Sequence, residues 1–345
     1  MELTPRKKII LSAIVKAHIA HGEPVGSKLL CQITDLGLSS ATMRNEMSDL
    51  CEMGYLEQPH TSAGRVPTAA GYRLYVSELL GKDSLSAPMQ ASIDRAIRKV
   101  AGDPENLTAM AGQALSDLTG FPAVSMTIPE AGAYVRRVEL LPMGRRMALL
   151  VLITSDGIAR SRICRTSEAL TETAIAAFDR IAAADIIGRE LTECSGVFLQ
   201  TVAAKTGEHA LTLMPLLSVL FEMIEQVCHS ELDLKGESNL YSFYHKESDA
   251  RKLVELISRR DVIQSILSEI SDPVSVVFGD DCGIEALRPS SMVVAKFGGG
   301  ENRVGRIGVI GPTRMAYEDL IPSISYFAKQ LGKVLEQSVR DLDDE

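Results

Sequence analysis

Residues 39–76 carry the sequence SSATMRNEMSDLCEMGYLEQPHTSAGRVPTAAGYRLYV, which predicts a helix, a tight β-hairpin and a second helix. The first helix should cover residues 40–53, because Met43, Met47 and Leu50 recur at the i, i+4, i+7 spacing of one helical face. The prolines and small residues that follow favour a hairpin. A helix followed by a β wing is the layout of a winged helix-turn-helix.

The opposite side of this helix is small, amide-bearing and cationic, with no acid in its first turn. Arginine and asparagine side chains can pair bidentately with guanine and adenine edges in the major groove of DNA. We therefore expect DNA contacts from Ser40, Ala41, Thr42, Arg44, Asn45 and Ser48.

The predicted hairpin pairs residues 55–60 with 65–68 across a flexible tip that ends in a cation. An arginine at a wing tip suits a phosphate contact or a narrow minor groove. Ser62 and Arg65 are therefore also expected to contact DNA. The ordinary alternative is that the arginines of the helix and of the tip are solvated surface residues. Helix-turn-helix segments also occur in domains that bind proteins.

Two helices are predicted upstream. Thr4 and Pro5 form a helix start, with Thr as N-cap and Pro at the first helical position, and Gly22 should end that helix. Ser27 is expected to cap a second helix over residues 28–33, and Ser39 or Ser40 to cap the third. Two helices across a glycine-containing turn match the helix-turn-helix pattern, so residues 1–80 are assigned to a DNA-binding domain.

Charge is balanced in this domain. Its first 80 residues hold eight Lys or Arg and eight Asp or Glu, whereas the whole chain has a net charge of -9. No broad basic field exists, which disfavours loose nonspecific coating of nucleic acid. Local positive charge is expected at residues 6–8, at Arg44 and at Arg65, and binding should depend on base contacts and paired half-sites.

Three stretches resemble one known family. GEPVGSKLL (22–30), the segment 39–76 and GRIGVIGPTRMAYED (305–319) closely resemble HrcA, the bacterial heat-inducible transcription repressors. Weaker matches are RVELLPMGRRMALLVLITSDG (137–157) and GESNLY (236–241), so the resemblance spans the chain in order. It implies a homodimeric repressor that binds an inverted-repeat operator (CIRCE) in double-stranded DNA upstream of chaperone operons. It also implies that the GroE chaperonin maintains activity, which is lost on heat stress.

The remainder predicts an α/β domain with an insertion. Strands are expected at 134–141, 146–153, 158–163, 274–278, 291–297 and 304–310, and a final helix at 321–339. We assign 81–105 to a connector, 106–165 and 236–345 to the α/β domain, and 166–235 to the insert. The resemblance implies that this domain is GAF-like and that the insert dimerises. The expected fold is therefore α+β and multidomain: a winged helix-turn-helix, then a GAF-like α/β domain with a helical dimerisation insert.

Residues 213–227 are apolar on nearly all sides and must be buried against something. A homodimer partner is the natural candidate, because an inverted repeat requires a two-fold protein. The alternative is that this helix belongs to the core of one chain. The expected dimer contacts are Leu213, Leu217, Leu220, Phe221 and Ile224.

Other classes of protein are weighed against this hypothesis. The six cysteines are far apart and form no C-x-x-C pair, which argues against zinc or a disulfide framework and for a reducing cytoplasm. No signal peptide is recognised, and the apolar run 211–221 is too short to span a bilayer. We therefore expect a cytoplasmic protein with no membrane, metal or cofactor partner.

Two alternative functions stay open. A GAF-like domain could hold a small ligand, although no convergent polar cluster can be named. An enzyme is disfavoured, because the six histidines and the acids show no defensible catalytic spacing. No catalytic residue is therefore predicted.

Overall fold

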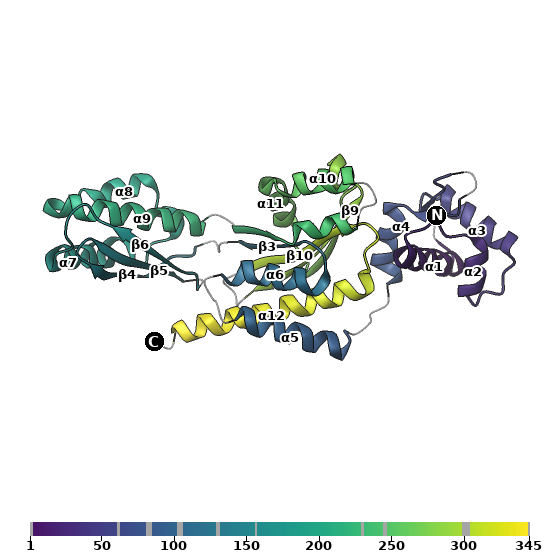
Figure 1. Ribbon diagram of the computed structural model, residues 1–345, viewed down its shortest axis with the longest axis horizontal. Helices are drawn as coiled ribbons and strands as arrows, with labels where there is room; N and C mark the ends of the chain where they lie inside the picture. The colour runs from purple at the N-terminus through teal and green to yellow at the C-terminus, as the bar shows by residue number, and fades with distance from the viewer. Residues whose placement is uncertain are drawn as a thin grey trace.

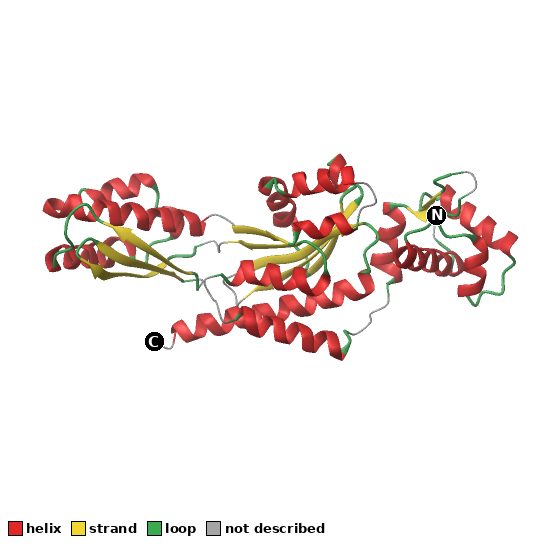
Figure 2. Cartoon of the chain, viewed as in Figure 1, coloured by secondary structure: helices red, strands yellow, loops and turns green. Residues whose placement is uncertain are grey.

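The computed structural model describes residues 3–60, 63–80, 85–101, 106–128, 132–155, 157–228, 231–243, 247–298 and 304–343. The fold is α+β and elongated, with three parts in a row (Figure 1). An N-terminal unit lies at one end, a five-stranded sheet between two helical layers lies in the middle, and a second sheet with its own helices lies at the other end. Figure 2 shows that the two large sheets are separate.

The N-terminal unit follows the predicted order of helices and hairpin. It comprises α1 (Pro5–His21), α2 (Ser27–Ile33), α3 (Ser40–Glu52), β1 (Leu56–Glu57), β2 (Val66–Pro67), α4 (Ala69–Leu74) and a π-helical turn (Tyr75–Leu79). As predicted, Thr4 caps α1 and Gly22 ends it in the left-handed conformation at φ 73°. Ser39, rather than Ser40, caps α3 by accepting a hydrogen bond from the Thr42 backbone N–H.

The expected capping role of Ser27 is wrong. Gly26 precedes α2 and Ser27 is its first residue, with no side-chain capping bond. The hydroxyl group of Ser27 instead lies 2.9 Å from that of Ser40. This contact ties α2 to the first turn of α3.

The middle part is one antiparallel sheet in the order β7-β3-β10-β9-β8. Helices α5, α6 and α12 cover one face, and α10 and α11 cover the other (Figure 1). The strands are β3 (Ala123–Ile128), β7 (Glu231–Lys235), β8 (Val274–Phe278), β9 (Ser290–Gly298) and β10 (Val304–Pro312). The helices are α5 (Ala87–Val100), α6 (Leu107–Thr119), α10 (Glu247–Ile257), α11 (Arg260–Glu269) and α12 (Tyr317–Asp343), with 3-10 turns at Glu237–Ser242 and Glu285–Leu287.

The motif at 305–319 is explained by close packing around β10. An added Cβ at Gly308 would lie 2.3 Å from the carbonyl oxygen of Val293 on β9, so a side chain there would push the strands apart. Arg306 is buried, and its guanidinium donates from Nη2 to the carbonyl oxygen of Ile270, at 2.7 Å. A cation at the C-terminal end of α11 complements the helix dipole.

The second sheet, at the far end, corrects the expected domain borders. It consists of β4 (Val135–Gly144), β5 (Met147–Thr154) and β6 (Ala159–Arg165), and no strand of it pairs with the described strands of the middle sheet. Its inner face packs on α7 (Glu172–Ile181) and α9 (Ala210–Cys228), and α8 (Gly196–Ala203) packs on α9. Short turns at Ala182–Ile186, Leu191–Glu193 and Gly207–His209 connect these helices.

We call residues 132–228 the insert. The expected insert at 166–235 left out β4, β5 and β6 and wrongly included β7, which pairs with β3 in the middle sheet. The expected connector is also more than a link, because α5 buries Ile93, Ile97 and Val100 in the same core as α12. Strand periodicity identifies strands but does not say which sheet they join.

The expected dimer residues lie in the core of a single chain. Leu213, Leu217, Leu220, Phe221 and Ile224 of α9 are all buried against the inner sheet face and α7 or α8. The intramolecular alternative therefore holds for these side chains, and none is free to contact a partner. The helical segment Gly207–Cys228 is longer than the apolar run 211–221 and is long and apolar enough to cross a membrane. Half of its most apolar 18-residue stretch is, however, buried inside the protein.

Candidate nucleic-acid interface

Helix α3 presents one face to the core and the other to solvent. Met43, Met47 and Leu50 are buried, as their spacing predicts. The opposite face is accessible: Ala41, Arg44, Asn45 and Ser48 are exposed, and Ser40 and Thr42 are half-buried. The six side chains expected to contact DNA therefore share one accessible face of one helix.

The cations at residues 6–8 do not form a free positive patch, contrary to expectation. Arg6 Nη1 lies 3.3 Å from a carboxylate oxygen of Glu46, and Lys7 Nζ lies 2.9 Å from the other. Lys7 also pairs with Asp49 of α3 at 2.8 Å. Hydrogen bonds to Asp49 and Glu46 raise the pKa of Lys7 above its usual value. Two carboxylates of α3 are thus neutralised, which lowers the repulsion between this helix and a polyanion.

Lys8 also has a carboxylate partner, because its Nζ lies 2.8 Å from Glu78 in the π-helical turn. Sequence alone could not identify these pairs, because the partners are far apart along the chain. The positive charge that remains available on the outer face of α3 is that of Arg44.

Arg65 anchors the hairpin through its backbone. Its N–H donates to the carbonyl oxygen of Val25, and the Val25 N–H donates to the carbonyl oxygen of Arg65, both at 2.9 Å. Gly64 is required here, since an added Cβ would lie 2.4 Å from the Val25 oxygen. The Arg65 Nε is buried without a hydrogen-bond partner in the described part of the chain. Ser62 lies outside the described residues.

The N-terminal unit docks on the start of α12 through a small set of contacts that we call the hinge contact. Lys16 of α1 pairs with Glu318 at 3.1 Å, and the Tyr75 hydroxyl donates to the same carboxylate at 2.6 Å. Beside them, the rings of Tyr72 and Tyr317 lie 6.2 Å apart. The hinge contact holds the outer face of α3 in a defined orientation to the middle sheet.

The hinge contact includes a second group of contacts, between α4 and the end of β8. Arg73 of α4 forms an ion pair with Asp281, and its guanidinium carbon lies 5.8 Å from the centroid of the Phe278 ring. Sequence reasoning missed the hinge contact. Several of its residues belong to the motifs quoted above: Tyr72, Arg73 and Tyr75 lie in 39–76, and Tyr317 and Glu318 lie in 305–319.

Burial shifts the pKa values of three side chains in or beside the hinge contact. It lowers the pKa of His18, with a smaller contribution from Arg314, and it raises the pKa of Tyr72 and Tyr317 well above the usual value. His18 Nδ1 lies 2.6 Å from the Tyr72 hydroxyl. A neutral imidazole can accept that hydrogen bond.

Glu318→Gln should show how much the contacts of Glu318 with Lys16 and Tyr75 contribute to the free energy of unfolding. The hydrogen bond from Tyr75, aided by Lys16, lowers the pKa of Glu318 from its usual 4.5. A lowered carboxyl pKa stabilises the folded state above pH 4.5, and this contribution disappears as the pH falls through the folded-state pKa. The difference in unfolding free energy between wild type and Glu318→Gln, from urea titrations, should therefore shrink below pH 4.5. If the difference in unfolding free energy did not change with pH, this expectation would be contradicted. Glu52→Gln, at an exposed position of α3, is the control.

The described residues contain no group of three or more His, Cys, Asp or Glu placed to hold a metal ion. All six cysteines are thiols, and burial raises the pKa of Cys164, Cys194 and Cys282. A raised thiol pKa disfavours the reactive thiolate.

Comparison with known proteins identifies the family. The model of the HrcA protein C terminal domain matches residues 105–321. The chain belongs to the HrcA family. The heat-inducible transcription repressor HrcA of Acetivibrio thermocellus is 30% identical over 344 residues, with 98% of both chains covered. That of Clostridium tetani is 31% identical over 339 residues, with 97% of this chain and 96% of the relative covered.

A solved structure has the same fold. It is described as a crystal structure of a hypothetical protein at 2.2 Å resolution, and it matches with a TM-score of 0.71, 23% identity and coverage of 98% of this chain and 100% of that one. As an HrcA member, the chain is a transcription repressor and not an enzyme.

Proposed function

We propose that this HrcA member represses heat-shock chaperone operons from the cytoplasm by binding an inverted-repeat CIRCE operator as a dimer. The main support for this proposal is the outer face of α3, because the other face of this helix is buried in the core. The outer face presents exposed or half-buried side chains: Ser40, Ala41, Thr42, Arg44, Asn45 and Ser48. In this proposal the N-terminal unit acts as a winged helix-turn-helix, with α3 in the major groove and the β1–β2 hairpin as the wing.

A gel-shift assay tests the operator assignment. The full chain should bind a CIRCE-type inverted repeat more tightly than a single half-site and far more tightly than a scrambled duplex of the same composition. Equal binding to all three duplexes by folded protein would contradict the proposal.

Arg44→Ala should weaken operator binding by about 1–3 kcal/mol and relax discrimination at one base pair in each half-site. The reason is that Arg44 is the exposed cation on the base-facing side of α3. The assay is competition gel shift with operators changed one base pair at a time. Arg98→Ala, which removes an exposed cation from α5, is the control and should change nothing. Unchanged base discrimination in Arg44→Ala would remove this residue from the recognition face.

Arg65→Ala should weaken binding evenly across operator sequences and reduce the slope of log affinity against log salt by about 1. The Arg65 side chain is half-buried beside the β1–β2 hairpin, so the accessible part of its guanidinium can reach a backbone phosphate of DNA bound along the hairpin. Titrations at several salt concentrations measure the slope. A slope equal to that of wild type would exclude a phosphate contact by Arg65.

The dimer requires a different surface from the one expected in α9. The outer face of the insert sheet carries Leu141, Leu149 and Ile163 in one cross-strand row, and Met147 lies next to Leu149 along that face of β5. Leu141, Met147 and Ile163 are exposed, while the alternate residues of β5 are buried against the helices. Monomers rarely expose an apolar sheet face of this kind, and a second copy of this chain is the occupant that a two-fold operator demands.

The proposed GroE dependence has a physical rationale in the same face. Before two copies pair, an exposed apolar sheet favours aggregation, and chaperonin that holds such chains would maintain the pool of active dimer. Chaperonin and ATP should therefore raise the fraction of protein that is active in operator binding. The same active fraction with and without chaperonin, after mild heating, would contradict the dependence.

A further inference from the structure

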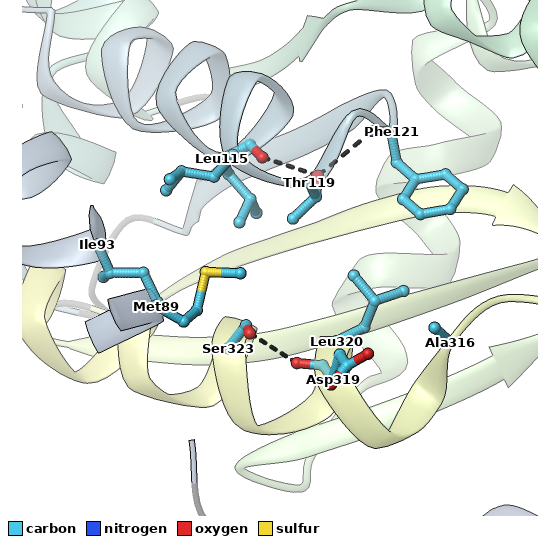
Figure 3. A pocket seen from close by; sticks show the side chains of 10 residues that line it. Met89, Ile93, Leu115, Thr119, Phe121, Ala316, Asp319, Leu320 and Ser323 are labelled. Carbon is cyan, nitrogen blue, oxygen red and sulfur yellow. Dashed lines mark hydrogen bonds between the residues drawn. The ribbon is translucent and has the colours of Figure 1, made fainter. Parts of the chain in front are cut away.

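A cavity lies in the helical layer beneath the middle sheet. It has a volume of about 210 Å³, opens to solvent on one side, and is lined by α5, α6, Phe121 and the start of α12 with the preceding Ala316. Figure 3 shows Met89 and Ile93 of α5 at one side, Leu115 and Thr119 of α6 above, and Asp319, Leu320 and Ser323 of α12 below. No segment of the described chain fills it.

The inner wall is apolar and the mouth is acidic. Ile93, Leu115 and Leu320 are buried side chains that face the cavity. Asp319 is exposed at its edge, forms no ion pair with any described residue, and has no cationic neighbour among the lining residues. An apolar cavity of about 150 Å³ can hold a benzene-sized group. The space therefore fits one small ring or short alkyl group, with room at the mouth for a polar atom.

We propose that this cavity binds a small amphipathic amine, with the apolar body among Ile93, Leu115 and Leu320 and the ammonium group beside Asp319. A cation is favoured over an anion because the lining carries one carboxylate and no positive charge. The site does not involve DNA, so its test is independent of the operator proposal.

The position of the cavity gives it a route to the N-terminal unit. Ala316, Asp319 and Leu320 line the cavity, whereas Tyr317 and Glu318, on the other side of the same helical turn, form the hinge contact. An occupant that shifts this turn must act on the contact that holds α1 and the π-helical turn. Ligand binding should therefore alter amide hydrogen exchange in residues 16–18 and 72–75.

The first test compares three probes of similar size by isothermal titration of the full chain: phenethylamine, ethylbenzene and phenylacetate. Phenethylamine should bind about tenfold more tightly than phenylacetate, with ethylbenzene between them. Asp319→Asn should reduce that ratio to near one, and Asp117→Asn, an exposed acid of α6 outside the cavity, should leave it unchanged. No binding by any probe, or an equal ratio in Asp319→Asn and wild type, would overturn the proposal.

The second test fills the cavity with a larger side chain. Ser323 is buried and lines the cavity, so Ser323→Leu should abolish probe binding and leave the thermal unfolding midpoint equal to or above that of wild type. Ser268→Leu, at an exposed position of α11, is the control for the added leucine. A midpoint several degrees lower in Ser323→Leu alone would show that there is no space to fill, and retained binding of phenethylamine would place its site elsewhere.

Discussion

Ile163→Asp should convert the protein to a monomer and weaken binding to the full inverted repeat roughly 10²–10⁴-fold, because two linked half-site contacts become independent. Ile163 is 59% exposed in one chain, at the β6 end of the row that joins β4, β5 and β6. A carboxylate there stays solvated in the isolated chain, so the insert should remain folded. In a symmetric dimer it is desolvated against an apolar sheet, and its copy brings a second negative charge.

Sedimentation and gel shift give the two readouts. Affinity for a single half-site should stay within a few-fold of wild type, because the N-terminal unit is untouched. Val197→Asp is the matched control, since it places the same charge on another exposed apolar residue of the insert, in α8. A dimer retained in Ile163→Asp but lost in Val197→Asp would assign the interface to the helical side of the insert.

Leu217→Asp should also abolish the dimer, but by a different route: it should unfold the insert. Leu217 is 0% exposed and lies in the core formed by α9, α7 and the inner face of the sheet. An unpaired charge at such a position is expected to destabilise by at least about 3–5 kcal/mol. Circular dichroism and hydrogen exchange should report loss of structure in residues 132–228, with the middle sheet retained.

The control for this prediction lies on the same helix. Leu211 is 67% exposed at the start of α9, so Leu211→Asp should leave the insert folded. A folded but monomeric Leu217→Asp would contradict the assignment of this residue to the core. Together, Leu217→Asp and Ile163→Asp separate a loss of dimer through the core from a loss at the surface.

The N-terminal elements were predictable because local signals specify them. The apolar spacing of Met43, Met47 and Leu50, the Thr4 cap and the left-handed Gly22 each act within a few residues, and each agrees with the structure. The face of α3 expected to contact DNA is likewise the exposed face, because one helical period fixes both sides at once.

The sheets were harder to predict because strand pairing is a long-range property. Residues 123–128 and 231–235 form β3 and β7, and neither was predicted. The strands β4, β5 and β6 were located to within a few residues but assigned to the wrong sheet. A buried helix such as α9 gives the same pattern whether its partner is its own chain or a second copy, so burial alone misled the choice of interface.

The pairing of β3 with β7 has a consequence for the modularity of the chain. Thr127 lies opposite Glu231, so the point where the chain leaves the middle sheet and the point where it returns are neighbours across one strand pair. A short hairpin turn could join these two strands with every other pairing in the sheet intact. The insert could therefore be removed, or exchanged for another folded module, without redesign of the sheet that carries it.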